Sequence, residues 1–161
     1  MKSKATTIDT AEIPIPPPLI YVVPFLIGVL LHHTIGGDTV PETARTTARL
    51  AGWALVILGV AINVSAWVAF LRAKTPVIPT RPTTAIVTSG PYRFTRNPLY
   101  ASLTIVYAGV PLILGYLWPY IFLPLVLFLI VRLVIEREER YLERRFGADY
   151  TRYRDAVRRW I

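Results

Sequence analysis

The chain carries no charged side chain between Arg96 and Arg132, an uncharged run of 35 residues. As one straight helix this run would be about 50 Å long, whereas the hydrocarbon core of a bilayer is roughly 30 Å thick. Because a single crossing cannot accommodate it, the run predicts two apolar helices that turn back on each other at residues 115–119. We expect the two helices to cover residues 99–116 and 118–135.

Two further apolar segments precede this hairpin. They cover residues 17–35 and 50–71, and Pro24 is expected to interrupt the first of them. Hydrophobic residues make up 53% of the chain, and its charges are segregated rather than interspersed. These features predict an all-α, polytopic membrane protein with about four transmembrane helices and a cytoplasmic amphipathic helix at its C-terminus. A single domain over residues 1–161 would then comprise a flexible arm (1–16), membrane helices (17–135) and a cytoplasmic helical tail (136–161).

The distribution of basic residues predicts the orientation of these spans. The connection over residues 72–96 carries five basic residues and no acid, whereas the loop over residues 36–49 mixes both signs. By the positive-inside rule the basic connection is cytoplasmic, and with four spans both termini lie on the same side as it does. The net charge of +8 then indicates contact with anionic lipid. Nucleic-acid binding explains it less well, because the basic residues flank apolar spans.

Several other kinds of site are disfavoured by the sequence. The chain has no cysteine, which excludes disulfides, thiolate metal ligands and a cysteine nucleophile. His32 and His33 are adjacent and point about 100° apart on a helix, and no third ligand is evident, so we expect no metal. No glycine-rich nucleotide loop of the soluble kind follows a strand, which excludes a Rossmann-type architecture.

A carboxylate pair follows the last apolar segment. At about 100° per residue, Glu138 lies on the same helical face as the apolar residues Val134, Ile135 and Leu142, whereas Glu139 is expected on the polar side in exposed ion pairs. A carboxylate on an apolar stripe is costly unless a donor or cation satisfies it. Glu138 is therefore the stronger functional candidate, although a purely structural carboxylate held by an arginine is the alternative reading.

One combination of motifs resembles a known family. The segment Arg96-Asn97-Pro98 with Tyr100 is followed by the apolar hairpin, by Glu138-Glu139, and then by Phe146-Gly147 and Tyr150-x-x-Tyr153. This order is similar to that of the isoprenylcysteine carboxyl methyltransferases, integral membrane enzymes that use S-adenosylmethionine and are related to phospholipid methyltransferases. The resemblance covers residues 75–160. Asn97 departs from it, because the family more often has histidine there, and asparagine cannot titrate near neutral pH.

The resemblance implies a set of site residues. It places the cofactor in a pocket formed by Thr84, Ala85, Ile86, Val87, Tyr92, Asn97, Pro98, Leu99, Tyr100, Glu138 and Glu139. It also makes Arg93, Arg96 and Glu138 the candidate catalytic residues.

The chemistry of its residues allows two interpretations of the loop that contains Arg96 and Asn97. S-adenosylmethionine carries an ammonium that would suit Glu138, a carboxylate that would suit Arg96 or Asn97, and an adenine that would suit an aromatic wall of Tyr92 or Tyr100. Asn97 and Pro98 also form a helix-entry signal in which asparagine caps the helix and proline occupies its first turn. The alternative reading is therefore a capped helix with arginines at the lipid headgroups.

The sequence predicts a membrane methyltransferase that takes S-adenosylmethionine from the cytoplasm and a lipophilic acceptor from the bilayer. The expected acceptor is a carboxylate of the isoprenylcysteine type, which Arg93 or Arg96 would neutralise. A phospholipid amine is the alternative within the same chemistry. From other classes, the chain could be a non-catalytic lipid-binding membrane protein or a relative of nicotinamide-dependent reductases.

Overall fold

The structure, a computed structural model, describes residues 11, 13–37, 39–76 and 83–160. The all-helical fold class is confirmed. The elements are α1 (Pro17–Ile35), α2 (Glu42–Arg72), the short 3-10 helix η1 (Gly90–Arg93), α3 (Pro98–Leu114), α4 (Trp118–Ile121), α5 (Leu123–Ile130), the π-helical turn η2 (Val131–Ile135), α6 (Glu136–Phe146) and α7 (Ala148–Ala156).

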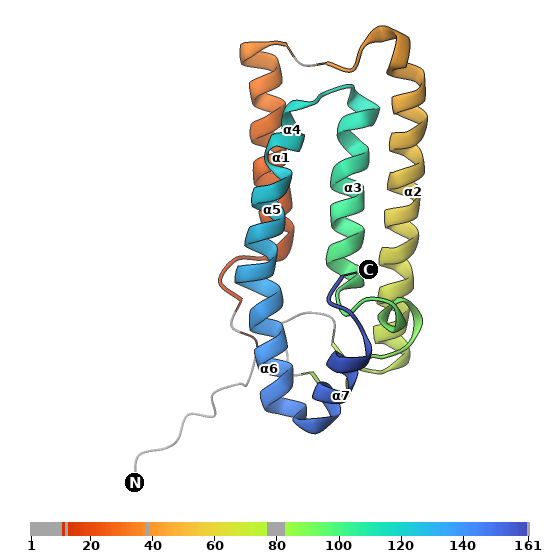
Figure 1. The fold of residues 1–161 in the computed structure, drawn as a ribbon, viewed down its shortest axis with the longest axis vertical. Coiled ribbons are helices and arrows are strands. Elements are labelled where there is room, and N and C mark those ends of the chain that lie inside the picture. Colours follow the sequence, from red (N-terminus) through yellow and green to blue (C-terminus); the bar gives the residue numbers. More distant parts are fainter. Residues whose placement is uncertain (1–10, 12, 38, 77–82, 161) are drawn as a thin grey trace.

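The long helices lie side by side and run alternately up and down (Figure 1). α1 and α3 run in one direction, while α2 and the continuous run from α4 to α6 return in the other. The loops that follow α1 and α3 meet at one end, where Val40 N–H donates to the Gly115 carbonyl over 3.1 Å and Thr39 pairs with Tyr116. The connection between α2 and α3 lies at the opposite end, together with α6 and α7.

Proline and glycine mark the ends of the apolar helices. Pro17 and Pro98 begin α1 and α3 at the position where a missing N–H costs nothing. Gly36 and Gly115 follow the last turns with φ values of 74° and 80°, which glycine adopts without strain. The expected interruption at Pro24 is wrong, because α1 continues through this residue. Pro24 is buried, and its packing offsets the backbone hydrogen bond that proline cannot make.

Glycine allows α2 and α3 to pack at close range. A Cβ atom added at Gly52 would lie 2.7 Å from the Gly109 carbonyl oxygen, and one added at Gly59 would lie 2.9 Å from the Ser102 carbonyl oxygen. Within this contact Asn63 Nδ2 donates to Ser102 Oγ over 2.8 Å. Small residues and an interhelical hydrogen bond are the usual means of joining helices in an apolar environment.

Tyrosine and tryptophan side chains join the remaining helices. The Tyr21 hydroxyl of α1 donates to the Tyr100 carbonyl of α3 over 3.0 Å. At the far end the Tyr107 hydroxyl donates to the Pro119 carbonyl over 2.8 Å, and Trp118 Nε1 donates to the Gly36 carbonyl over 3.1 Å. These bonds hold the α3–α4 hairpin against α1.

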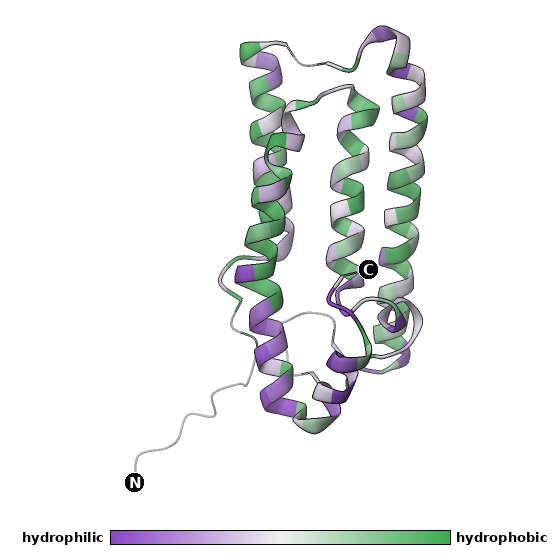
Figure 2. Cartoon of the chain, viewed as in Figure 1, coloured by the Kyte–Doolittle hydropathy of each residue, from purple (hydrophilic) through white to green (hydrophobic). Residues whose placement is uncertain are grey.

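The outer surface of the bundle is suited to a membrane. α1 and α2 are each long and apolar enough to cross one, and α3 is a shorter apolar helix. Large apolar side chains are exposed along α2, including Leu50 at 66%, Ile57 at 65% and Leu71 at 68%. Hydrophilic residues gather instead on α6 and α7 (Figure 2). The chain is therefore membrane-associated, and a crossing by all four helical runs stays a prediction.

Two described residues of the segment before α1 contact the bundle. Ala11 is 6% exposed, and Ile13 packs against the core formed by α1, α3 and α5. Burial of an apolar side chain against the core stabilises its position. The proline-rich composition of this segment did not indicate such a contact. The rest of the expected arm before Ala11 lies outside the described residues.

Candidate active site

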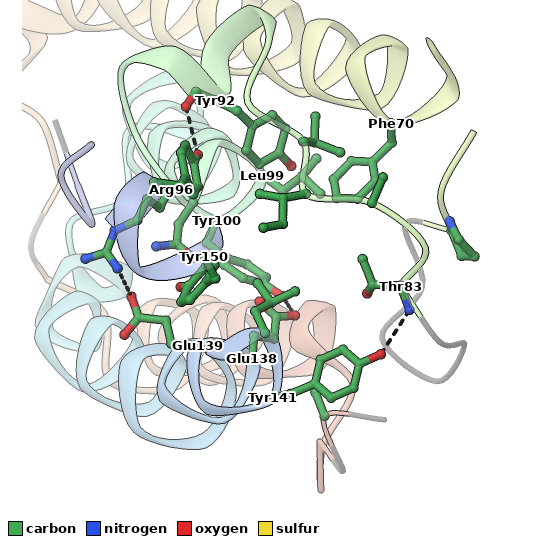
Figure 3. A pocket seen from close by; sticks show the side chains of 18 residues that line it. Phe70, Thr83, Tyr92, Arg96, Leu99, Tyr100, Glu138, Glu139, Tyr141 and Tyr150 are labelled. Carbon is green, nitrogen blue, oxygen red and sulfur yellow. Dashed lines mark hydrogen bonds and ion pairs between the residues drawn. The ribbon is translucent and has the colours of Figure 1, made fainter. Parts of the chain in front are cut away.

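A cavity lies at the end of the bundle that carries α6 and α7, and Figure 3 shows the side chains that line it. Its volume is about 120 Å³, several times the space that one water molecule needs. Residues from the end of α2, the α2–α3 connection, the start of α3, α6 and α7 line it. Its lining includes Ala11, Phe70, Pro76, Thr83, Ala85, Ile86, Val87, Tyr92, Arg96, Asn97, Leu99, Tyr100, Glu138, Glu139, Tyr141, Leu142, Tyr150 and Tyr153.

Glu138 reaches the cavity from the first turn of α6. The Tyr100 hydroxyl donates to its Oε1 over 2.6 Å, which joins α3 to α6 across the cavity wall. Burial raises the pKa of Glu138 to about 7, the Tyr100 hydrogen bond opposes this rise, and the neighbouring Glu139 charge adds to it. No ion pair to Glu138 is found among the described residues. Within the described part of the chain it is therefore a carboxylate without a cation, and it faces the cavity.

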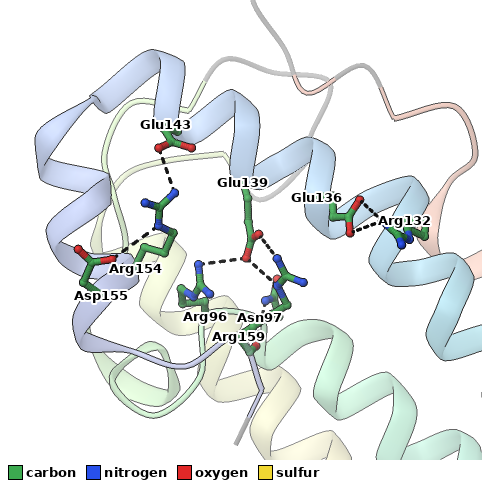
Figure 4. Close-up of polar contacts among 9 residues, drawn as sticks. All are labelled: Arg96, Asn97, Arg132, Glu136, Glu139, Glu143, Arg154, Asp155 and Arg159. Carbon is green, nitrogen blue, oxygen red and sulfur yellow. Dashed lines mark hydrogen bonds and ion pairs between the residues drawn. The ribbon is translucent and has the colours of Figure 1, made fainter.

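Glu139 lies elsewhere than the helical phase predicted. Its side chain is 15% exposed and meets two arginines, so the expectation of an exposed polar position is wrong (Figure 4). Arg159 binds both of its oxygens, with Nε 3.1 Å from Oε1 and Nη2 2.6 Å from Oε2. The wide π-helical turn η2, directly before α6, departs from the regular spacing on which the phase argument rested.

Arg96 lines the cavity without using all of its donors. Its Nη1 lies 3.1 Å from Glu139 Oε1, and its side chain is 12% exposed. Its Nε and Nη1 are buried and have no hydrogen-bond partner within the described part of the chain. Unpaired buried donors on a charged group are costly, and a ligand that supplied acceptor oxygens would remove the cost.

The C-terminal segment after α7 binds the loop that carries Arg96. The Arg96 N–H donates to the Arg158 carbonyl over 2.9 Å, and the Arg159 carbonyl accepts from both Thr95 Oγ1 and Asn97 Nδ2 over 3.0 Å. Asn97 occupies the N-cap position of α3, but its side chain makes no capping hydrogen bond. The expected cap is therefore wrong, because the tail carbonyl takes the asparagine donor instead.

Aromatic side chains form much of the cavity wall. Tyr92 from η1 stacks edge-on against Phe70 from α2, with ring centroids 5.4 Å apart. The Tyr153 hydroxyl donates to the Tyr92 carbonyl over 2.8 Å, which ties α7 to η1. Burial raises the pKa of Tyr92, Tyr150 and Tyr153, so all three remain neutral donors at ordinary pH. Neutral aromatic rings around a carboxylate favour a cationic or flat aromatic ligand.

The structure brings most of the candidate residues together and leaves three outside. Arg93 is exposed and does not line the cavity. The Thr84 side chain is exposed and donates to the Lys74 carbonyl over 3.3 Å, while Pro98 is buried beneath the wall. The candidates that line the cavity are Ala85, Ile86, Val87, Tyr92, Arg96, Asn97, Leu99, Tyr100, Glu138 and Glu139.

Other wall residues were not expected from the sequence. Phe70 and Ala11 come from segments that precede the resemblance. Tyr141 lies three residues after Glu138, and its hydroxyl accepts from the Thr83 N–H over 3.0 Å. Helical spacing from Glu138 could have indicated Tyr141, since residues three apart share a face. Nothing in the local pattern indicated Arg159, whose partner lies twenty residues earlier.

The cavity presents opposite charges within one wall. Among the residues that the structure describes, the Glu138 carboxylate forms no ion pair, and Arg96 Nε and Nη1 have no hydrogen-bond acceptor. An amino acid carries an ammonium and a carboxylate that complement this pair, and the apolar and aromatic residues of the wall suit a flat ring. No cluster of residues able to hold a metal ion is present in the described residues.

Comparison with known proteins supports a membrane enzyme. The profile of the phospholipid methyltransferase family matches residues 47–149, which include most of α2, all of α3 and both glutamates of the pair. An uncharacterized protein of Haemophilus influenzae is 36% identical over 63 residues, which are 39% of this chain and all of that protein. No solved structure matches the chain.

Proposed function

This chain belongs to the phospholipid methyltransferase family, and we propose that it transfers a methyl group from S-adenosylmethionine to a lipophilic acceptor. The observation that carries the cofactor assignment is that one cavity contains both Glu138, which forms no ion pair among the described residues, and two buried Arg96 donor atoms that have no hydrogen-bond partner there. Glu138 would hold the ammonium of the cofactor, and Arg96 its carboxylate. Ala85, Ile86, Val87, Leu99 and the aromatic wall would hold its adenine.

When bound, the cofactor supplies an electrophilic methyl group on its sulfonium centre. The protein has to position the two reactants in line and to keep water from the reacting atoms. Tyr100 and the paired helices α3 and α6 fix the position of the Glu138 carboxylate. Tyr92, Tyr150 and Tyr153 close the wall beside it, held by the hydrogen bond between Tyr153 and the η1 backbone.

The placement of the arginines favours an amine acceptor. A carboxylate acceptor was expected to be neutralised by Arg93 or Arg96. Arg93 lies outside the cavity, and Arg96 is shared between Glu139 and the proposed cofactor carboxylate. A second carboxylate would therefore enter a wall that has no cation to spare among the described residues. A neutral amine on a lipid headgroup needs none.

The remaining alternatives make different demands on the cavity. A nicotinamide cofactor bearing a phosphate would need several cationic contacts, whereas Arg96 is the one arginine among the described lining residues. A lipid-binding scaffold without catalysis would not need a desolvated carboxylate such as Glu138. Neither alternative requires the negative charge of Glu138 and the positive charge of Arg96 in the same cavity.

Calorimetric titration of the detergent-purified protein tests the cofactor assignment. We expect S-adenosylhomocysteine to bind and NADPH not to bind. Transfer of a labelled methyl group to phosphatidylethanolamine or to a farnesylated cysteine, measured side by side, then tests the acceptor. Methylation of the farnesylated cysteine alone would reverse the preference for an amine. Binding of NADPH in place of S-adenosylhomocysteine would remove the proposed activity.

A further inference from the structure

Glu139 lies between two arginines, Arg96 and Arg159, and its contacts with them differ in strength. Arg159 binds both carboxylate oxygens, and its shorter contact is 2.6 Å. Arg96 approaches one oxygen through Nη1 at 3.1 Å but without the alignment of a hydrogen bond. Two-point guanidinium binding is the stronger arrangement, so Arg159 is the principal partner of Glu139.

The backbone fixes Arg159 in this position. Its carbonyl accepts from Thr95 and Asn97, which flank Arg96, and the Arg96 N–H itself binds the preceding carbonyl of Arg158. These hydrogen bonds hold the backbone of Arg158 and Arg159 against the loop on both sides of Arg96. The Arg159 side chain, which is 37% exposed, reaches Glu139 from this anchored backbone.

We propose that Arg159 is a positioning residue that, by occupying Glu139, keeps the guanidinium of Arg96 available to the carboxylate of a bound amino-acid group. The proposal rests on the proposed use of S-adenosylmethionine. Glu139 and the two arginines together carry one net positive charge, and of the two arginines Arg96 is the one that lines the cavity. Without Arg159, the 15%-exposed Glu139 would turn to Arg96 and satisfy its unused donors.

Two ligands separate this role from general support of the fold. S-adenosylhomocysteine has the amino-acid end, whereas methylthioadenosine has the same adenosine without it. Arg159→Gln should weaken S-adenosylhomocysteine binding by about tenfold or more, the loss expected for a hydrogen bond to a charged group. Methylthioadenosine should bind within about twofold of its wild-type affinity. Arg158→Gln is the matched control, because the Arg158 side chain is exposed and next in sequence.

A second substitution should reverse the effect of the first. In Glu139→Gln/Arg159→Gln no carboxylate remains to capture Arg96, so S-adenosylhomocysteine affinity should return to within about twofold of wild type. Arg159→Lys keeps the charge without two-point binding and should give an intermediate affinity. These opposite directions cannot both result from a loosened fold.

Calorimetric titration of each detergent-purified variant with both ligands decides the matter. Equal weakening of the two ligands by Arg159→Gln, or a double variant no better than Arg159→Gln, would overturn the positioning role. So would Arg159→Gln binding S-adenosylhomocysteine as tightly as wild type. Wild-type protein that binds neither ligand would instead remove the proposed function itself, and this inference with it.

Discussion

Two neighbouring carboxylates of α6, those of Glu138 and Glu139, have different interaction partners. Glu138 has a tyrosine hydroxyl and a cavity beside it, whereas Glu139 has two guanidinium groups. The first is therefore available to an ammonium, and the second is already neutralised by the protein. The two glutamates are adjacent in sequence, but their interaction partners differ, and so do the roles that these partners allow.

Replacement of each carboxylate by its amide tests this separation. Glu138→Gln should weaken S-adenosylhomocysteine binding by about 1.5 to 3 kcal/mol, because a hydrogen bond to a charged group is lost, while Glu139→Gln should have much less effect. Calorimetric titration measures both, and each variant is the control for the other. Equal losses would show that the two glutamates act as one unit.

The pH dependence of binding should report the ionisation of Glu138. Burial raises the pKa of this carboxyl to about 7, so below that pH the group is protonated and cannot pair with an ammonium. Affinity for S-adenosylhomocysteine should therefore fall by up to about tenfold for each pH unit below 7, and it should level off above 7. Titrations from pH 5 to 8 in wild type and Glu138→Gln test this, and the variant should lose the acidic decline. An identical decline in both would assign the titration to another group.

At the scale of elements, the contact between α2 and α3 depends on glycine. A Cβ at Gly52 would meet the Gly109 carbonyl at 2.7 Å and the Ile113 backbone nitrogen at 2.9 Å, and neither backbone atom can move freely. Gly52→Ala should therefore destabilise the bundle by about 1 to 3 kcal/mol. Thermal unfolding in detergent measures the loss. Ala51→Val, at an exposed neighbouring position, should leave the midpoint nearly unchanged.

Helix positions were largely predictable from the sequence, because they depend on local signals. The apolar segment over residues 17–35 predicted α1, and the uncharged run with the helix-entry signal at Asn97 and Pro98 predicted α3 to within two residues at each end. The π-helical turn η2 was not predictable, since no residue type marks it. The burial of Glu139 was also missed, because it depends on Arg159, which a segment distant in sequence brings to α6.

The candidate site was predictable where the residues themselves suggested chemistry. Glu138, Tyr100 and Arg96 were expected and lie on one cavity wall. Arg93 was expected for its charge, but its position on the outer side of η1 depends on tertiary packing. Phe70 carries no polar group that could have marked it as a wall residue.

At the scale of the whole molecule, the alternating helices place the two sets of loops at opposite ends (Figure 1). In the proposed four-span arrangement, single cysteines at Ser89 and Ala148 should react with a membrane-impermeant thiol reagent from the cytoplasmic side. A cysteine at Thr39 should react from the other side. All three positions are exposed, and the chain has no native cysteine to obscure the labelling. Labelling of Ser89 and Ala148 from opposite sides would exclude this topology.

The proposed acceptor enters from the bilayer, so the length of its apolar tail should control its apparent affinity. Each methylene withdrawn from water contributes about 0.8 kcal/mol. Shortening a tail by five carbons should therefore raise KM by well over tenfold. Methyl transfer to a chain-length series in micelles, corrected for partitioning, measures this. Rates that do not depend on tail length would mean that the helices act as an anchor alone.

The position of the cavity at one end of the bundle also bears on which lipids could react in the proposed function. At the far end Thr39 pairs with Tyr116, and Trp118 Nε1 donates to the Gly36 carbonyl, while the cavity is lined by residues of α6 and α7 at the opposite end. In the proposed orientation, headgroups of the outer leaflet have no access to Glu138. Methylation would then alter one leaflet alone, and the enzyme would generate a compositional asymmetry across the bilayer that persists until lipids exchange between its two sides.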